Sequence, residues 1–131
     1  MTIVVCGGTG FMGGAAVRQL LRTGHTVRIL TRSEPRARTV VAHWPEGPAA
    51  LASDRVTFAE GDITERASLP RALAGARVVI QAAQFPGVPV EDPRRGYTYM
   101  NVDRGGTINL LAALRDVAER GQETATTAAE V

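Results

Sequence analysis

The sequence predicts an α/β fold in which a doubly wound parallel sheet carries helices on both faces. Short apolar runs rich in β-branched residues alternate with helical patterns along the chain, and a glycine-rich turn follows the first of these runs directly. The order βαβαβαβ requires crossover connections between parallel strands. Such connections are right-handed and place helices on both sides of the sheet.

Four short apolar segments are expected to form the strands. These are residues 2–6, 27–31, 56–60 and 78–82, of which the first and the last are typical of strands buried on both faces of a parallel sheet. A complete sheet of this kind has about six strands, so this one is expected to be incomplete. Its fourth strand would then leave unpaired N–H and C=O groups along an open edge. We therefore expect a homodimer, a complementing chain or aggregation at that edge.

Apolar residues spaced three and four apart predict the helices. The first pattern covers residues 16–21, after the glycine turn, and Gly24 supplies its C-terminal stop. Proline and glycine predict loops at residues 44–48 and 84–96. The other segments expected to be helical are residues 34–43, 67–73 and 100–118.

Length and composition indicate one globular domain. The 131 residues suffice for a core, and 44% of them are hydrophobic. We expect this domain to cover residues 1–119, and residues 120–131, which show no apolar period, to form a disordered tail. No apolar run approaches the ~20 residues that span a bilayer, and the start lacks the basic region of a signal peptide. The expected location is therefore cytoplasmic, without membrane contact.

Charge and cysteine content argue against two further classes of partner. The net charge is +2, and the basic residues are scattered along the chain, which disfavours nucleic acid. Neither His25 nor His43 has acidic or thiol neighbours at ligand spacing, and a lone Cys6 cannot form a thiolate cluster. We expect no metal site. Cys6 is expected to pack inside the fold and not to react.

Three of the glycines that follow the first strand are spaced three residues apart. Gly7, Gly10 and Gly13 form the pattern G-x-x-G-x-x-G. The first allows a tight turn, the second lets the backbone approach a pyrophosphate, and the third lets the helix lie close to the strand. Phosphates would meet the free N–H groups at the helix start. The pattern predicts a nucleotide-binding turn, and the alternative is a turn that only connects strand to helix.

The run from Val5 to Gly13 resembles the fingerprint of extended and atypical short-chain dehydrogenases/reductases of the NAD-dependent epimerase/dehydratase kind, which have the Rossmann fold. Residues 60–64, 79–83 and 101–111 agree with that family as well, so the resemblance covers roughly residues 2–118. It implies an NAD(P) cofactor held at the glycine turn and after the third and fourth strands. Besides the three glycines, the cofactor-binding residues that the resemblance implies are Thr9, Phe11, Met12, Asp62, Ile63, Ala82 and Ala83.

The end of the second strand bears on the choice of cofactor. An NAD-specific site places an acid there to bind the ribose hydroxyls, whereas this sequence has Arg32. A guanidinium suits a 2′-phosphate, and Arg36 and Arg38 could add to the same pocket. We expect NADP(H) to be preferred, with NAD(H) possible. The alternative is that Arg32 is a solvated loop charge.

The family's catalytic pair is missing from these residues. The resemblance implies a Tyr-x-x-x-Lys dyad, but the chain has only Tyr97 and Tyr99 and no lysine. We therefore expect no catalytic residue here. Three interpretations stay open: the cofactor domain of an oxidoreductase or epimerase, truncated or completed by another chain; a non-catalytic NADP(H)-binding sensor or structural module; and a truncated product without independent function.

Overall fold

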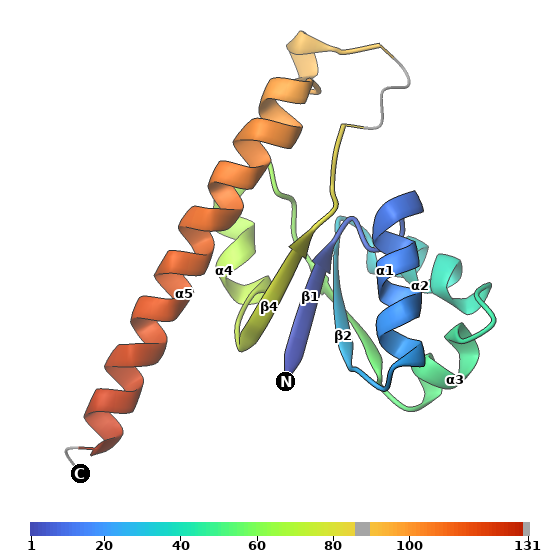
Figure 1. The fold of residues 1–131 in the computed structure, drawn as a ribbon. Helices are drawn as coiled ribbons and strands as arrows, with labels where there is room; N and C mark the ends of the chain where they lie inside the picture. The colour runs from blue at the N-terminus through green and yellow to red at the C-terminus, as the bar shows by residue number, and fades with distance from the viewer. Residues whose placement is uncertain (86–89, 130–131) are drawn as a thin grey trace.

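The computed structural model describes residues 1–85 and 90–129, with side chains up to residue 121. Its centre is a four-stranded parallel sheet of order β3-β2-β1-β4, with helices on both faces (Figure 1). This confirms the predicted fold class. The strands are β1 (Thr2–Cys6), β2 (Val27–Thr31), β3 (Val56–Glu60) and β4 (Ala76–Gln81).

The central strand β1 has its side chains divided between two cores. Ile3 and Val5 join the core beneath one layer of helices, whereas Val4 and Cys6 join the core on the opposite face. This alternation follows from the period of two in a strand. In the register, Ile3 pairs with Val27 of β2 on one side and with Val78 of β4 on the other.

One face of the sheet is covered by α1 (Phe11–Arg22), α2 (Glu34–Ala42) and α3 (Gly47–Ala52). The α3 helix begins inside the segment expected to be a loop. The reason is that Pro48 stands in its first turn, where the missing N–H costs nothing. Gly47 is required there, because an added Cβ would lie 1.7 Å from the carbonyl oxygen of Val41.

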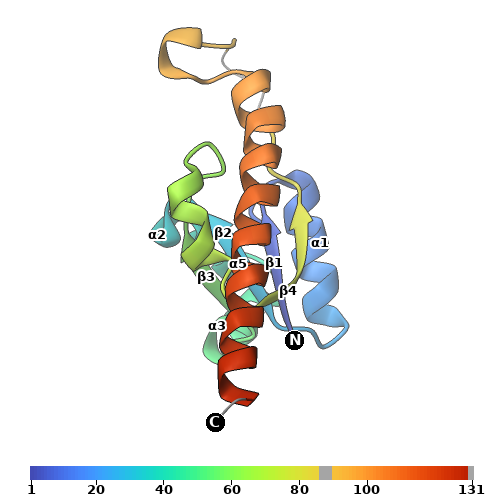
Figure 2. The same cartoon turned by 90° about the vertical axis from the view of Figure 1, so that its left-hand side faces the viewer.

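The opposite face is covered by α4 (Leu69–Ala72), which follows the 3-10 turn η1 (Arg66–Ser68), and by α5 (Gly106–Ala129). Figure 2 shows α5 crossing in front of the sheet and continuing past it at its C-terminal end. The 3-10 turn η2 (Pro93–Arg95) and the π-helical segment η3 (Met100–Gly105) precede α5.

Two further expectations differ from the structure. The tail expected to be disordered is instead helical through Ala129, in keeping with its helix-favouring alanine, glutamate and glutamine residues and its lack of proline. The fourth strand starts two residues earlier than predicted and is not buried on both faces: 42% of Val78 is exposed. The cause is its place at the edge, where β1 is its only neighbour among the described strands. None of the helices described is long and apolar enough to cross a membrane.

Candidate dinucleotide-binding site

The glycine turn lies at the carboxyl end of β1, a strand that has a neighbour on each side. The chain leaves β1, forms the turn and enters α1, while β2 and β4 flank β1 on either side. The helix after β1 covers one face, and the helix after β4 covers the other (Figures 1 and 2). In open α/β sheets, ligands bind in the crevice that forms outside the carboxyl ends of the strands at such a switch point.

Gly7 brings the turn against the chain that leaves β4. Its φ is +74°, and an added Cβ would lie 2.7 Å from both the carbonyl carbon of Ala82 and the nitrogen of Ala83. The Ala82 N–H also donates to the carbonyl oxygen of Cys6 at 3.0 Å. Two regions predicted to contact the cofactor are therefore adjacent, and only glycine fits at this position.

The other two glycines of the pattern differ in the space around them. An added Cβ at Gly13 would lie 2.0 Å from the carbonyl oxygen of Gly7, so there is no room for a side chain. An added Cβ at Gly10 would meet a single atom, that same oxygen, at 3.3 Å, and otherwise faces open space. The turn is thus closed toward the fold and open toward solvent.

The start of α1 has the properties of an anion site. Its N-cap, Gly10, provides no side-chain hydrogen bond, and its first turn contains no acid. The first N–H groups of a helix lack intrahelical partners and carry the positive end of the dipole. Phe11 and Met12 are 93% and 70% exposed, and Thr9 is exposed beside them. A phosphate could approach these N–H groups without displacing a side-chain cap.

Arg32 is exposed at the carboxyl end of β2. Among the described residues it forms no hydrogen bond or ion pair, and the same is true of Arg36. Arg38 is engaged instead, because it donates to Glu34 at 2.7 Å and lies 5.0 Å over the ring of Phe58. Of the three arginines considered from sequence, Arg32 and Arg36 thus remain available to a ligand.

The segment after β3 is a loop organised by its own polar groups. The Asp62 carboxylate accepts hydrogen bonds from the N–H and the hydroxyl of Thr64, at 2.8 and 2.7 Å. Ser68 accepts from the Asp62 N–H at 2.9 Å. Ile63 is buried, and its carbonyl oxygen accepts from the Asn109 side chain of α5 at 2.9 Å. Asp62 therefore shapes the loop with its carboxylate.

Residues of η3 and α5 hold the segment after β4, and sequence reasoning gave them no role. The Ala83 N–H donates to the side-chain oxygen of Gln81 at 3.1 Å, and the amide nitrogen of Gln81 reaches Thr107 at 3.4 Å. The Phe85 N–H donates to the Asp103 carboxylate at 2.9 Å. The segment that resembles the family includes Asp103, Thr107 and Asn109. Their hydrogen-bond partners in these contacts are 18 or more positions away in the sequence, so the motif itself does not reveal them.

Cys6 and the two tyrosines pack against other side chains of the fold. Cys6 is fully buried, and burial raises the pKa of its thiol to about 11. Such a thiol fills space in the core and is a poor nucleophile. Tyr97 and Tyr99 contact the ring of Phe85 edge-on, with centroids 4.8 and 4.7 Å away. The Phe85 ring is buried by these contacts.

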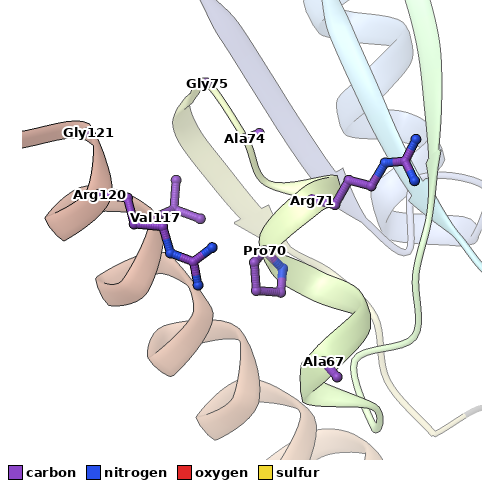
Figure 3. Close-up of a pocket in the computed structure, with 8 residues that line it drawn as sticks. All are labelled: Ala67, Pro70, Arg71, Ala74, Gly75, Val117, Arg120 and Gly121. Atoms are coloured by element: carbon purple, nitrogen blue, oxygen red, sulfur yellow. The ribbon is translucent and has the colours of Figure 1, made fainter. Parts of the chain in front are cut away.

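A hollow of about 720 Å³ lies between α4 and α5 (Figure 3). Small and apolar residues such as Pro70 and Val117 line much of it. Gly75, also in its lining, stands at the amino end of β4. The glycine turn follows the carboxyl end of β1, so this hollow lies toward the other end of the sheet. It is separate from the candidate site.

Comparison with known proteins shows which family this chain resembles in sequence. Residues 3–127 match the sequence profile of the NAD dependent epimerase/dehydratase family. The chain is 28% identical to vestitone reductase from Medicago sativa, over 85% of this chain and 33% of that protein. It is 30% identical to UDP-glucose 4-epimerase from Lacticaseibacillus casei, over 87% of this chain and 31% of that protein.

A solved structure shows the same fold. It is a UDP-glucose-4-epimerase from Stenotrophomonas maltophila with bound NAD and formylated UDP-arabinopyranose. The TM-score is 0.68 at 23% identity, over 90% of this chain and 34% of that one. The chain spans about a third of the length of each of these three proteins.

Proposed function

Because the chain belongs to the NAD-dependent epimerase/dehydratase family, we propose that its residues 1–119 bind an NAD(P) dinucleotide across the carboxyl ends of the strands. One observation carries the proposal. The glycine turn excludes any side chain at Gly13, yet leaves Gly10 open before an uncapped helix start. That combination fits a pyrophosphate, which needs close backbone approach and free N–H donors.

Each part of the dinucleotide has a proposed place. The pyrophosphate lies on the turn, with Thr9, Phe11 and Met12 around it. The adenosine half lies over the ends of β2 and β3, beside Asp62 and Ile63, because the ribose contacts of such sites come from the end of the second strand. The nicotinamide half then lies toward Ala82 and Ala83. The bound cofactor would supply the capacity for hydride transfer.

A preference for NADP(H) over NAD(H) is the finer proposal. Arg32 stands where an NAD-specific site has an acid, and among the described residues no acid pairs with it. The carboxylate of Glu34 pairs with Arg38 at 2.7 Å on the surface, which partly offsets its repulsion of a 2′-phosphate. A guanidinium binds such a phosphate through a planar pair of donors.

The proposed role is that of a cofactor domain within an oxidoreductase or epimerase. The 131 residues contain no lysine, so a Tyr-x-x-x-Lys dyad would have to come from residues outside them. We propose that the chain alone binds cofactor without turnover. A non-catalytic NADP(H) sensor or structural module, and a truncated product without function, remain the alternatives. The cytoplasmic location likewise remains a proposal.

A protein partner is proposed at the free side of β4. Among the described strands β4 pairs with β1 alone, and Val78 is substantially exposed on it. From Val78 to Ile80 this edge has apolar side chains and no proline, which favours pairing with another strand, and Arg77 at its start is the one charged residue of β4. A strand from a second copy of the chain or from a complementing chain would pair with the free N–H and C=O groups of this edge.

Calorimetric titration of the purified chain with NADPH and with NADH tests the proposed function. We expect both to bind, and NADPH to bind more tightly. Absence of binding by either dinucleotide, from a sample shown to be folded by circular dichroism, would overturn the proposal.

A further inference from the structure

We infer that Asn109 and Asp103 are positioning residues that hold the two halves of the dinucleotide site separately, Asn109 the adenosine side and Asp103 the nicotinamide side. The inference deepens the proposed function and rests on it. Both residues belong to one continuous helical stretch, since η3 leads directly into α5. Figures 1 and 2 show that this stretch runs beside α4 and β4.

Asn109 ties α5 to the loop after β3. Its side-chain amide donates to the carbonyl oxygen of Ile63 at 2.9 Å. Gly106, one turn earlier, allows close contact, because an added Cβ would lie 2.6 Å from the Ile63 side chain. Within the loop, the hydrogen bonds from Thr64 to the Asp62 carboxylate set the backbone conformation. The hydrogen bond from Asn109 fixes the position of the loop relative to the sheet.

Asp103 ties η3 to the segment after β4. Its carboxylate accepts from the Phe85 N–H at 2.9 Å, a charge-assisted bond in a half-buried place. Its carbonyl oxygen accepts from the Thr107 hydroxyl at 2.7 Å. The side-chain nitrogen of Gln81 in turn donates to the Thr107 hydroxyl at 3.4 Å. The side-chain oxygen of Gln81 accepts from the Ala83 N–H. The chain that leaves β4 is thus held at two points.

The two contacts serve opposite sides of the turn. The loop after β3 stands on the β2 and β3 side, and the segment after β4 stands on the other side of β1. A dinucleotide with its pyrophosphate on the turn after β1 must extend its two nucleosides in these two directions. Loss of one contact should therefore weaken recognition of one nucleoside while the other is still bound.

Two ligands separate these effects. Adenosine 2′,5′-bisphosphate reports on the adenosine side alone, and NADPH reports on both sides. We expect Asn109→Asp, which keeps the shape but replaces the donor by an acceptor, to weaken both ligands by the same factor. We expect Asp103→Ala to weaken NADPH and to leave the bisphosphate unchanged. Each loss should be about two- to tenfold, the size of one hydrogen bond.

The chain offers matched controls for both variants. Asn101 is another asparagine of this stretch, and its side chain donates to the carbonyl oxygen of Gly96, at 3.1 Å, and not to a residue of either segment. Asn101→Asp should leave both affinities unchanged. Asp103→Asn keeps an acceptor for the Phe85 N–H and should restore NADPH affinity. If Asn109→Asp does not fold, Asn109→Ser removes the contact without adding a charge.

The outcomes are distinct. Equal loss of both ligands in Asp103→Ala, or unchanged bisphosphate affinity in a folded Asn109 variant, would overturn the inference while leaving the proposed function intact. Failure of the unsubstituted chain to bind NADPH would overturn the proposed function, and this inference with it. A selective loss on each side, with recovery in Asp103→Asn, supports separate positioning contacts.

Discussion

The carbonyl oxygen of Gly7 lies 2.0 Å from the place that a β-carbon on Gly13 would occupy. We predict that Gly13→Ala lowers the free energy of unfolding by about 3 kcal/mol, at the upper end of overpacking effects, because backbone atoms must move. Chemical denaturation measures it. At the neighbouring Gly14, an added Cβ would meet Trp44 at 3.4 Å, so Gly14→Ala serves as the control. Equal stability of the two variants would contradict the account of the turn.

The preference for NADPH over NADH should reverse when the positive charge of Arg32 is replaced by a negative one. We predict that Arg32→Asp binds NADH more tightly than NADPH, because the contact to the 2′-phosphate, worth ~1.5 to 3 kcal/mol, is lost and a repulsion replaces it. Calorimetric titration measures both affinities. Arg77→Asp makes the same charge change on β4 and should leave the order as it was. If NADH binds the unsubstituted chain as well as NADPH does, Arg32 is only a surface charge.

The open strand should govern assembly. We predict that the chain is larger than a monomer in light scattering coupled to size exclusion, and that Val78→Lys shifts it toward the monomer, because a charge on an edge strand discourages pairing. Val40 on α2 is similarly exposed, so Val40→Lys should not change the mass. A stable monomer of the unsubstituted chain, with slow amide exchange in β4, would show that the edge is protected.

Cys6 predicts a pH dependence of stability. Burial raises the pKa of its thiol from 9.0 to about 11. Between these two pH values the thiol stays protonated in the folded state but ionises in the unfolded state. The contribution of Cys6 to the free energy of unfolding is therefore complete below pH about 9 and is lost as the pH rises to about 11. We expect the stability difference between the chain and Cys6→Ala to shrink across that window, measured by urea unfolding. A constant difference would show that the thiol is not desolvated.

Local sequence patterns predicted the bounds of β1, β2 and β3. In β1 and β2 most side chains are buried, and β-branched residues packed on both faces leave little choice of structure. Burial does not explain β3, which is an edge strand and is buried only at Val56. The bounds of β4, the other edge strand, differ from those expected, because an apolar pattern does not reveal whether a neighbour is present. The helix at Gly47 was missed because proline breaks a helix interior yet starts one readily.

The geometry of the candidate site could be predicted only in part, and for a physical reason. The positive φ of Gly7 and the close contact of Gly13 with Gly7 follow from local backbone geometry, which a short motif specifies. The contact of Gly7 with Ala82 and Ala83 is not local. The bond from Asn109 to Ile63 joins residues 46 positions apart, and the contact of Asp103 with Phe85 depends on how η3 meets β4. Such contacts depend on the packing of whole elements, which no local pattern encodes.

We propose that the open face of the glycine turn holds the pyrophosphate. The backbone at Gly10 is extended, with φ −79° and ψ −179°, which a valine can adopt. An added Cβ would lie 3.3 Å from the carbonyl oxygen of Gly7, so that atom must shift by a few tenths of an ångström, while the rest of the side chain fills the space above the turn. The decisive measurement is calorimetric titration of Gly10→Val with NADPH, beside the unsubstituted chain and with helix content compared by circular dichroism. We expect binding to be abolished while helix content stays nearly the same. An unchanged NADPH affinity in the folded variant would contradict the proposed pyrophosphate site.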